Sequence, residues 1–93
     1  MALKIIEKKG NFLIEGSITG YNVQAMKIHF EYILRKRNQL TINISDVSEI
    51  NSDGLSAMSK MYNYALLSKK LFTIIGKGSK EMYAYFKQQN IVE

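Results

Sequence analysis

Apolar and polar residues alternate at the start of the chain and again near its middle, which is the pattern of strands with one buried face. Leu3 to Lys8 and Phe12 to Glu15 are two such segments, and the turn residues Lys9-Gly10-Asn11 between them predict a hairpin. Leu40 to Ser45 alternates in the same way, and Leu71 to Ile75 is a short apolar run typical of a buried strand. The pattern therefore predicts four strands.

Three other segments repeat their apolar residues every three or four positions, the period of an amphipathic helix. The first begins at Val23, after a loop from Gly16 to Asn22 whose last residue is the expected N-cap. The second begins at Leu55 behind a polar turn from Asp46 to Asp53, and the third follows Ser79, its expected cap. The apolar stripe of the third helix is expected at Met82, Tyr83 and Phe86, with Ile91 and Val92 packing back on the core.

The resulting element order is β-β-α-β-α-β-α, and the closing strand-helix-strand unit requires a parallel pair of strands. A parallel strand covered by helices on both sides would be apolar on both faces, whereas Leu40 to Ser45 is apolar on one face only. We therefore expect an α/β fold in which a mixed sheet carries its helices mainly on one face. Residues 1–93 are expected to form a single domain, because this length suits one core.

The composition excludes several kinds of functional site. The chain has no cysteine, which excludes a disulfide, a thiolate nucleophile and a zinc site with sulfur ligands. No apolar run approaches the roughly 18–20 residues that span a bilayer, so no membrane insertion is expected. The N-terminus reads as a strand and not as a signal peptide, and we expect a cytoplasmic protein.

Enzyme signals are weak. The only histidine, His29, lies inside the first predicted helix with no cysteine or second histidine to share a metal. Gly76-Lys77-Gly78-Ser79 sits between a strand and a helix, but it is too short for the G-x-x-x-x-G-K-[ST] loop that wraps phosphates. We therefore expect no catalytic residue, no metal site and no cofactor.

The net charge of +5 invites the idea of an acidic partner. Arg35, Lys36 and Arg37 close one predicted helix, and Lys69 and Lys70 close another. The helix macrodipole favours cations at these positions, so we interpret them first as solvated helix ends. A functional basic surface is the alternative.

The stretch from Asn43 to Leu55 is more informative, because a strand ends, a turn follows, and small polar residues open a long helix. Asn, Ser and Asp are ordinary helix caps, and that is one explanation for them. The stretch also resembles the STAS domain, the fold of sulphate-transporter and anti-sigma-antagonist domains. Leu40 to Ser45 with Asp46-Val47 resembles the family's strand, and Ile50-Asn51-Ser52-Asp53-Gly54-Leu55 resembles its Asp-Ser-Ser-Gly-Leu motif. The opening hairpin and the Gly16-Ser17-Ile18 loop fit as well.

The resemblance implies partner switching without catalysis. Stand-alone members of the family bind an anti-sigma factor, often a serine kinase, and so release a sigma factor in bacterial transcription regulation. The kinase phosphorylates the residue before the motif glycine, and a PP2C-type phosphatase removes the phosphate. A phosphate adds about −1.5 to −2 charge at pH 7, which breaks a docked fit by repulsion and desolvation.

This chain departs from the family pattern, because Asp53 precedes Gly54 and Asn51 replaces the first aspartate. Three hypotheses follow: Asp53 supplies a fixed negative charge, Ser52 or Ser56 takes the phosphate instead, or the partner is not a kinase. An aspartate has only about one charge, so it copies a phosphate poorly. We favour the first or the third hypothesis.

The expected docking surface is the helix start from Asn51 to Gly54, the loop from Gly16 to Tyr21 beside it, and exposed parts of the second predicted helix. Ser17, Tyr21, Ile50 and Tyr62 are candidate partner contacts, the tyrosines because this residue is enriched at interface hot spots. We expect a monomer or a weak homodimer. The alternatives are a STAS subunit of a lipid-type ABC transporter or of a stress-sensing assembly, and, from another class, a nucleic-acid-binding module. The predicted element order differs from the βαββαβ order of RNA-recognition domains, so no nucleic-acid partner is expected.

Overall fold

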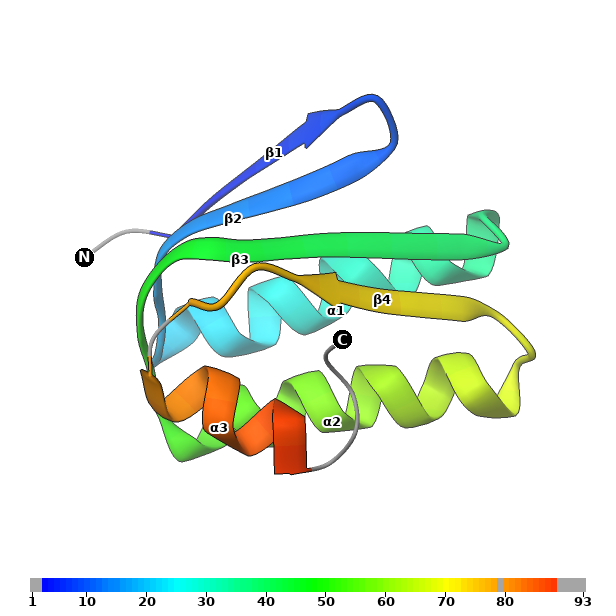
Figure 1. The fold of residues 1–93 in the computed structure, drawn as a ribbon. Helices are drawn as coiled ribbons and strands as arrows, with labels where there is room; N and C mark the ends of the chain where they lie inside the picture. Colours follow the sequence, from blue (N-terminus) through cyan, green and yellow to red (C-terminus); the bar gives the residue numbers. More distant parts are fainter. Residues whose placement is uncertain (1–2, 79, 89–93) are drawn as a thin grey trace.

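The computed structural model describes residues 3–78 and 80–88 and confirms the predicted order of elements. A hairpin of β1 (Leu3–Lys8) and β2 (Asn11–Ile18) is followed by α1 (Tyr21–Lys36), β3 (Gln39–Ile50), α2 (Ser52–Leu67), β4 (Leu71–Ile75) and α3 (Lys80–Gln88). Figure 1 shows α1 and α2 running alongside the strands of one sheet. No helix in these ranges is long and apolar enough to cross a membrane.

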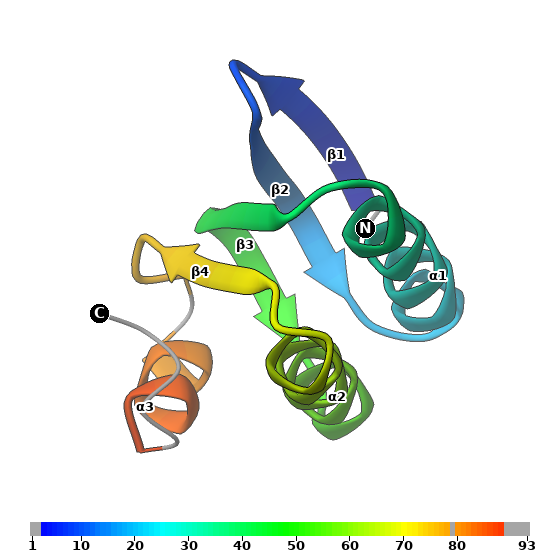
Figure 2. The ribbon, with the colours of Figure 1, turned by 90° about the vertical axis from the view of Figure 1, so that its right-hand side faces the viewer.

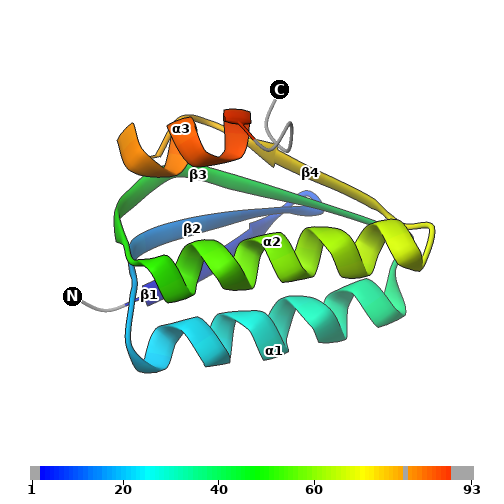
Figure 3. The ribbon, with the colours of Figure 1, turned by 90° about the horizontal axis from the view of Figure 1, so that it is seen from below.

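The four strands form a mixed sheet in the order β1-β2-β3-β4. β1 pairs with β2 in an antiparallel way, whereas the β2–β3 and β3–β4 pairs are parallel. Seen end-on in Figure 2, the three helices lie on the same side of the sheet. Figure 3 shows α1 and α2 side by side across it. The predicted mixed sheet with its helices on one face is therefore confirmed.

The core lies between the sheet and the two long helices, and it follows from the alternation read in the sequence. Ile42 and Ile44 of β3 are fully buried, while Thr41 and Asn43, which alternate with them, are partly exposed on the other face. Phe30 of α1 is also fully buried, and its ring meets that of Phe12 edge-on at a centroid distance of 5.5 Å. The apolar stripes of α1 and α2 close this core from the helix side.

Two strands are longer than the sequence pattern predicted. The segment from Gly16 to Ile18 continues β2 and is not a loop, and the segment from Asp46 to Ile50 continues β3 and is not a turn. The reason is long-range pairing, since Gly16 pairs with Val47 and Ile18 pairs with Ile50. Hydrogen bonds to a neighbouring strand override local turn chemistry.

The predicted helix caps differ from those observed. α1 begins at Tyr21 behind Gly20, whose φ of 58° is the left-handed region that favours glycine. Asn22 is therefore inside the helix and not its N-cap, and its side-chain Nδ2 donates to the Ser17 carbonyl at 3.1 Å. The predicted cap Ser79, the side chains of Tyr83 and Phe86, and the packing of Ile91 and Val92 lie outside the residues and side chains that the structure describes.

Candidate functional site

Two neighbouring parallel strands end side by side and turn into the two long helices. β2 ends at Ile18 and β3 ends at Ile50, and these two residues are partners in the sheet register. The turns into α1 and α2 therefore lie together at one end of the molecule, on the left of Figure 1. The carboxyl edge of parallel strands is the place where open α/β sheets commonly build binding surfaces.

The turn into α2 is fixed by Asn51, which the structure places as the N-cap of that helix. Its side-chain Oδ1 accepts from the Gly54 amide at 2.8 Å, and its own amide donates to the Ile18 carbonyl at 3.3 Å. The side-chain bond satisfies one of the amides that a helix start leaves without an intrahelical partner. Asn51 thus joins the start of α2 to the end of β2.

The motif glycine is required by a close approach and not by its backbone angles. A Cβ atom on Gly54 would lie 2.7 Å from the Ile18 carbonyl oxygen and 2.7 Å from Cγ1 of Ile50. Any larger residue would have to push the helix start away from the strand ends. Gly54 is buried, so the motif holds the first turn of α2 tightly against the sheet.

The residues between the cap and the glycine face the solvent. Ser52 and Asp53 are exposed, and Ser56 is exposed one turn further along α2. Asp53 lies in the first turn of the helix, where the macrodipole favours a negative charge. Tyr21, the first residue of α1, has 97% of its surface exposed beside this turn. An exposed tyrosine and a fixed helix start offer a surface for another protein.

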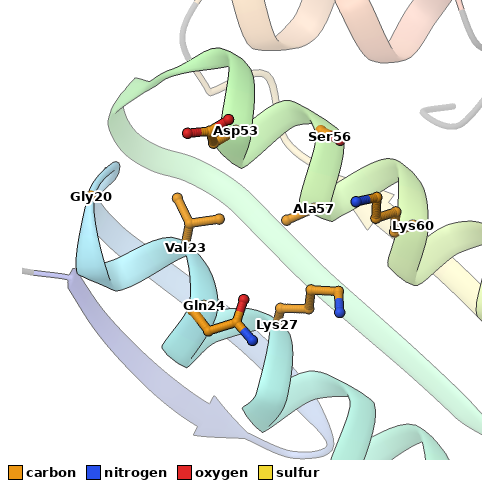
Figure 4. Close-up of a pocket in the computed structure, with 8 residues that line it drawn as sticks. All are labelled: Gly20, Val23, Gln24, Lys27, Asp53, Ser56, Ala57 and Lys60. Carbon is orange, nitrogen blue, oxygen red and sulfur yellow. The ribbon is translucent and has the colours of Figure 1, made fainter.

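A shallow groove of about 340 Å³ separates the N-terminal halves of α1 and α2. Figure 4 shows Asp53, Ser56 and Lys60 along the α2 side of this groove, with Gln24 and Lys27 on the α1 side. Lys27 forms an ion pair with Glu31 at 3.4 Å, one turn further along α1. The groove is polar and carries both signs of charge, which suits a protein partner with charged side chains of its own.

The structure gathers some of the predicted contact residues and not others. Tyr21 and the half-buried Ile50 lie at the motif end, beside Asn51 and Gly54. Tyr62 does not, because it is about 13 Å further along α2 and its half-buried ring packs edge-on against Phe72.

Ser17 was predicted as a partner contact, and its burial contradicts this. The side chain has no exposed surface, since the extension of β2 turns Ser17 toward the core. Its Oγ has no hydrogen-bond partner among the described residues. Ser17 therefore shapes the site only through its backbone carbonyl, which accepts from Asn22.

Lys27 and Lys60 were not anticipated as part of the site. The helical pattern put both on the polar side of their helices, but a single helix does not reveal which neighbour its polar side meets. No group of three or more His, Asp or Glu side chains with metal-binding geometry occurs among residues 3–78 and 80–88. The only histidine, His29, is exposed and contacts the rings of Phe12 and Phe30, away from this end.

Comparison with known proteins adds a likeness in fold. No family model matches the sequence, and no curated protein is similar enough to count as a relative. Among solved structures, the chain is similar to the anti-sigma factor antagonist SpoIIAA in its unphosphorylated form, with a TM-score of 0.74 and 10% sequence identity. The similarity covers 99% of this chain and 86% of that one. The chain therefore shares the fold of this protein, with a mixed four-stranded sheet and helices on one face.

Proposed function

We propose that this chain is a non-enzymatic regulatory domain that acts as an anti-sigma factor antagonist. It docks onto an anti-sigma factor, a serine kinase, through the start of α2. The observation that carries the proposal is the construction of the motif: Asn51 and Gly54 fix the helix start to the strand ends and leave Ser52 and Asp53 exposed between them. The likeness in fold to SpoIIAA over 99% of the chain supports the same role.

Asp53 makes the negative charge of this surface permanent. Its exposed carboxylate stands at the position that resembles the family's phospho-acceptor, and a carboxylate cannot be phosphorylated by a serine kinase. It carries about one charge where a phosphate carries about −1.5 to −2, so it does not repel the partner as a phosphate does. The chain is therefore an antagonist whose binding is not switched off by phosphorylation at this position. It acts in the cytoplasm as a single domain.

The same aspartate favours a second candidate function. A domain without a phospho-acceptor is suited to stable assembly, as a STAS subunit of a lipid-type ABC transporter or of a stress-sensing complex. In that case the start of α2 docks onto a transporter ATPase or onto other STAS domains. The identity of the bound partner separates the two functions.

A kinase assay tests the fixed-charge proposal. Wild-type protein, Asp53→Ser and the control Asp46→Ser are incubated with ATP and with the kinase that the wild type captures from a lysate of the native host, and their intact masses are recorded. Asp46 is exposed on β3 outside the motif, so its serine should not be phosphorylated. We expect a gain of about 80 Da, one phosphoryl group, on Asp53→Ser alone. Phosphorylation of the wild type at Ser52 or Ser56 overturns the fixed charge, and failure of the wild type to capture any kinase from a lysate of the native host overturns the proposed partner.

A further inference from the structure

The end of the molecule opposite the motif combines many cations with exposed leucines. The α1–β3 turn and the α2–β4 turn lie there, on the right of Figure 1, and the β1–β2 turn lies at the top of the picture. Hydrogen bonds join the first two, since Leu71 N donates to Asn38 O at 3.0 Å and Lys70 Nζ donates to Arg37 O at 3.0 Å. Arg37 also bonds Glu7 of β1 at 2.7 Å, which connects the third turn. These three turns are together called the basic end.

Seven of the thirteen lysines and arginines of the chain lie at the basic end. They are Lys8 at the end of β1, Lys9 in the hairpin turn, Arg35, Lys36 and Arg37 at the end of α1, and Lys69 and Lys70 after α2. Glu7 is paired with Arg37, one of these seven, and Glu31 is paired with Lys27, so six of the seven cations remain beside this one ion pair. The field of this end is therefore strongly positive.

Aliphatic side chains project from the same end. The exposed fractions are 87% for Leu67, 61% for Leu71 and 57% for Leu66, which is unusual for three leucines gathered at one turn. Tyr32 on α1 is also half exposed, and its ring lies 5.6 Å from the Lys36 ammonium. Cations around exposed leucines and a tyrosine are the composition of surfaces that lie on a bilayer, where the headgroups meet the acyl chains.

Backbone angles give a second, independent indication that lysine has a role at the basic end. Among the described residues, the non-glycine positions with positive φ are Lys9, at 52°, and Lys69, at 58°. Lys9 is the first residue of a two-residue hairpin turn, where Asn or Gly is usual. Lys69 follows the C-cap of α2, and the bonds from Lys69 N to Leu66 O and from Lys70 N to Ala65 O form the motif that normally carries glycine. Both strained turn positions of the basic end thus hold a cation.

We propose that the basic end binds the surface of a membrane rich in anionic lipids, with the leucines entering the headgroup region and the motif end facing the cytoplasm. Charge complementarity selects this occupant, and the leucines favour a bilayer over an acidic protein or a nucleic acid, which would match the cations alone. The association is peripheral and does not depend on the proposed partner of the motif end, because the two surfaces lie at opposite ends of the helices.

Co-sedimentation with vesicles tests this proposal. Full-length protein is mixed with vesicles of phosphatidylcholine containing about one third phosphatidylglycerol, and with pure phosphatidylcholine vesicles as the control. Each cation near an anionic surface strengthens binding about fivefold, so Lys69→Glu/Lys70→Glu should weaken it at least about 25-fold. Lys4→Glu/Lys77→Glu changes the net charge equally away from the basic end, Lys77 lying after the far end of β4, and should alter binding less than about twofold. Absence of binding to the anionic vesicles, or equal loss in both double variants, overturns the proposal.

Two further variants separate a bilayer from other polyanions and control for folding. Leu66→Ser/Leu67→Ser should weaken vesicle binding at least about tenfold, because partial burial of two leucines is lost. Undiminished binding of this variant would mean that charge alone is recognised, as on an acidic protein or a nucleic acid, and would overturn the membrane as occupant. Lys69→Gly relieves the left-handed backbone, so it should raise Tm by several degrees while lowering vesicle binding about fivefold. Unchanged vesicle binding in this better-folded variant would also count against the proposal.

Discussion

The carbonyl oxygen of Ile18 occupies the space that a side chain on Gly54 would need, since a Cβ atom there would lie 2.7 Å from it. This contact ties the end of β2 to the first turn of α2. It explains on steric grounds why the motif has a glycine at this position, although the backbone of Gly54 is not left-handed. The exposed residues next to it are thereby held in a fixed orientation.

Replacing Gly54 with alanine should destabilise the protein. Helix propensity favours alanine by about 1 kcal/mol, but the new methyl group meets a backbone oxygen that cannot rotate away, and overpacking costs about 1–3 kcal/mol. Because the clash is with the backbone, we take the upper end of the overpacking range and expect a net loss of about 2 kcal/mol in the free energy of unfolding, measured by urea denaturation. Ser56→Ala, on the exposed side of the same helix, should change it by less than about 0.5 kcal/mol. A Gly54→Ala protein as stable as the wild type would contradict the close approach.

Replacing Asn51 with aspartate should preserve the stability of the protein, whereas replacing it with alanine should lower that stability. Its Oδ1 accepts from the Gly54 amide, and loss of such a cap costs about 0.5–2 kcal/mol. Aspartate keeps an accepting oxygen and adds a charge that the helix dipole favours. Denaturation curves should therefore place Asn51→Asp at or above the wild type and Asn51→Ala below it. Equal losses in both variants would mean that the side-chain cap does not hold the helix start.

Removing the hydroxyl of Ser17 should stabilise the fold. The Oγ atom is buried without a hydrogen-bond partner among the described residues, and an unsatisfied buried group costs about 1–3 kcal/mol. We expect Ser17→Ala to raise the free energy of unfolding by about 1 kcal/mol. Partner binding should not change, because the side chain is not exposed. A destabilised Ser17→Ala protein would show that the hydroxyl is bonded in solution.

The ion pair between Glu7 and Arg37 should make stability depend on pH in the acidic range. The hydrogen bond from the Arg37 guanidinium lowers the pKa of the Glu7 carboxyl below its usual value. The folded state therefore favours the carboxylate. The stabilisation from this ion pair is complete above the pKa that Glu7 has in the unfolded state, and it is lost as the pH falls through the lower pKa of Glu7 in the folded state. The Tm difference between the wild type and Glu7→Gln should be small at pH 7, since the pair is exposed, and should vanish in strong acid.

An NMR titration examines the same ion pair directly. The side-chain carboxyl of Glu7 should titrate at a higher pH in Arg37→Gln than in the wild type, because the guanidinium that lowers its pKa is gone. Identical Glu7 titrations in the two proteins would contradict the pairing.

The order of elements was readable from the sequence because each one carries its own period. The alternation from Leu40 to Ser45 and the three-four spacing on both long helices were sufficient for the mixed sheet with helices on one face. The lengths of β2 and β3 were not readable, since the pairing of Ile18 with Ile50 joins residues far apart in the chain. That pairing also turned Ser17 inward and moved the start of α1 ahead of Asn22.

Only the part of the site that is formed by neighbouring residues in the sequence was predictable. The motif from Asn51 to Gly54 is local, so its helix start was visible in the sequence. The groove is not local, because Lys27 and Lys60 come from different helices and meet only when both pack on the sheet. Tyr62 has the residue type of a contact, but its place on α2 brings it against Phe72 instead.

A tagged pull-down from the native host, read by mass spectrometry with the intact mass of the bait, tests the central claim most directly. Wild type, Tyr21→Ala/Asp53→Lys and the control Lys4→Glu are compared, the control lying on the outer face of β1. The account predicts an anti-sigma kinase or a PP2C-type phosphatase with the wild type and the control, its loss with the double variant, and an unmodified bait. A transporter ATPase held instead, or a partner retained equally by the double variant, would contradict the claim that the start of α2 docks onto an anti-sigma factor.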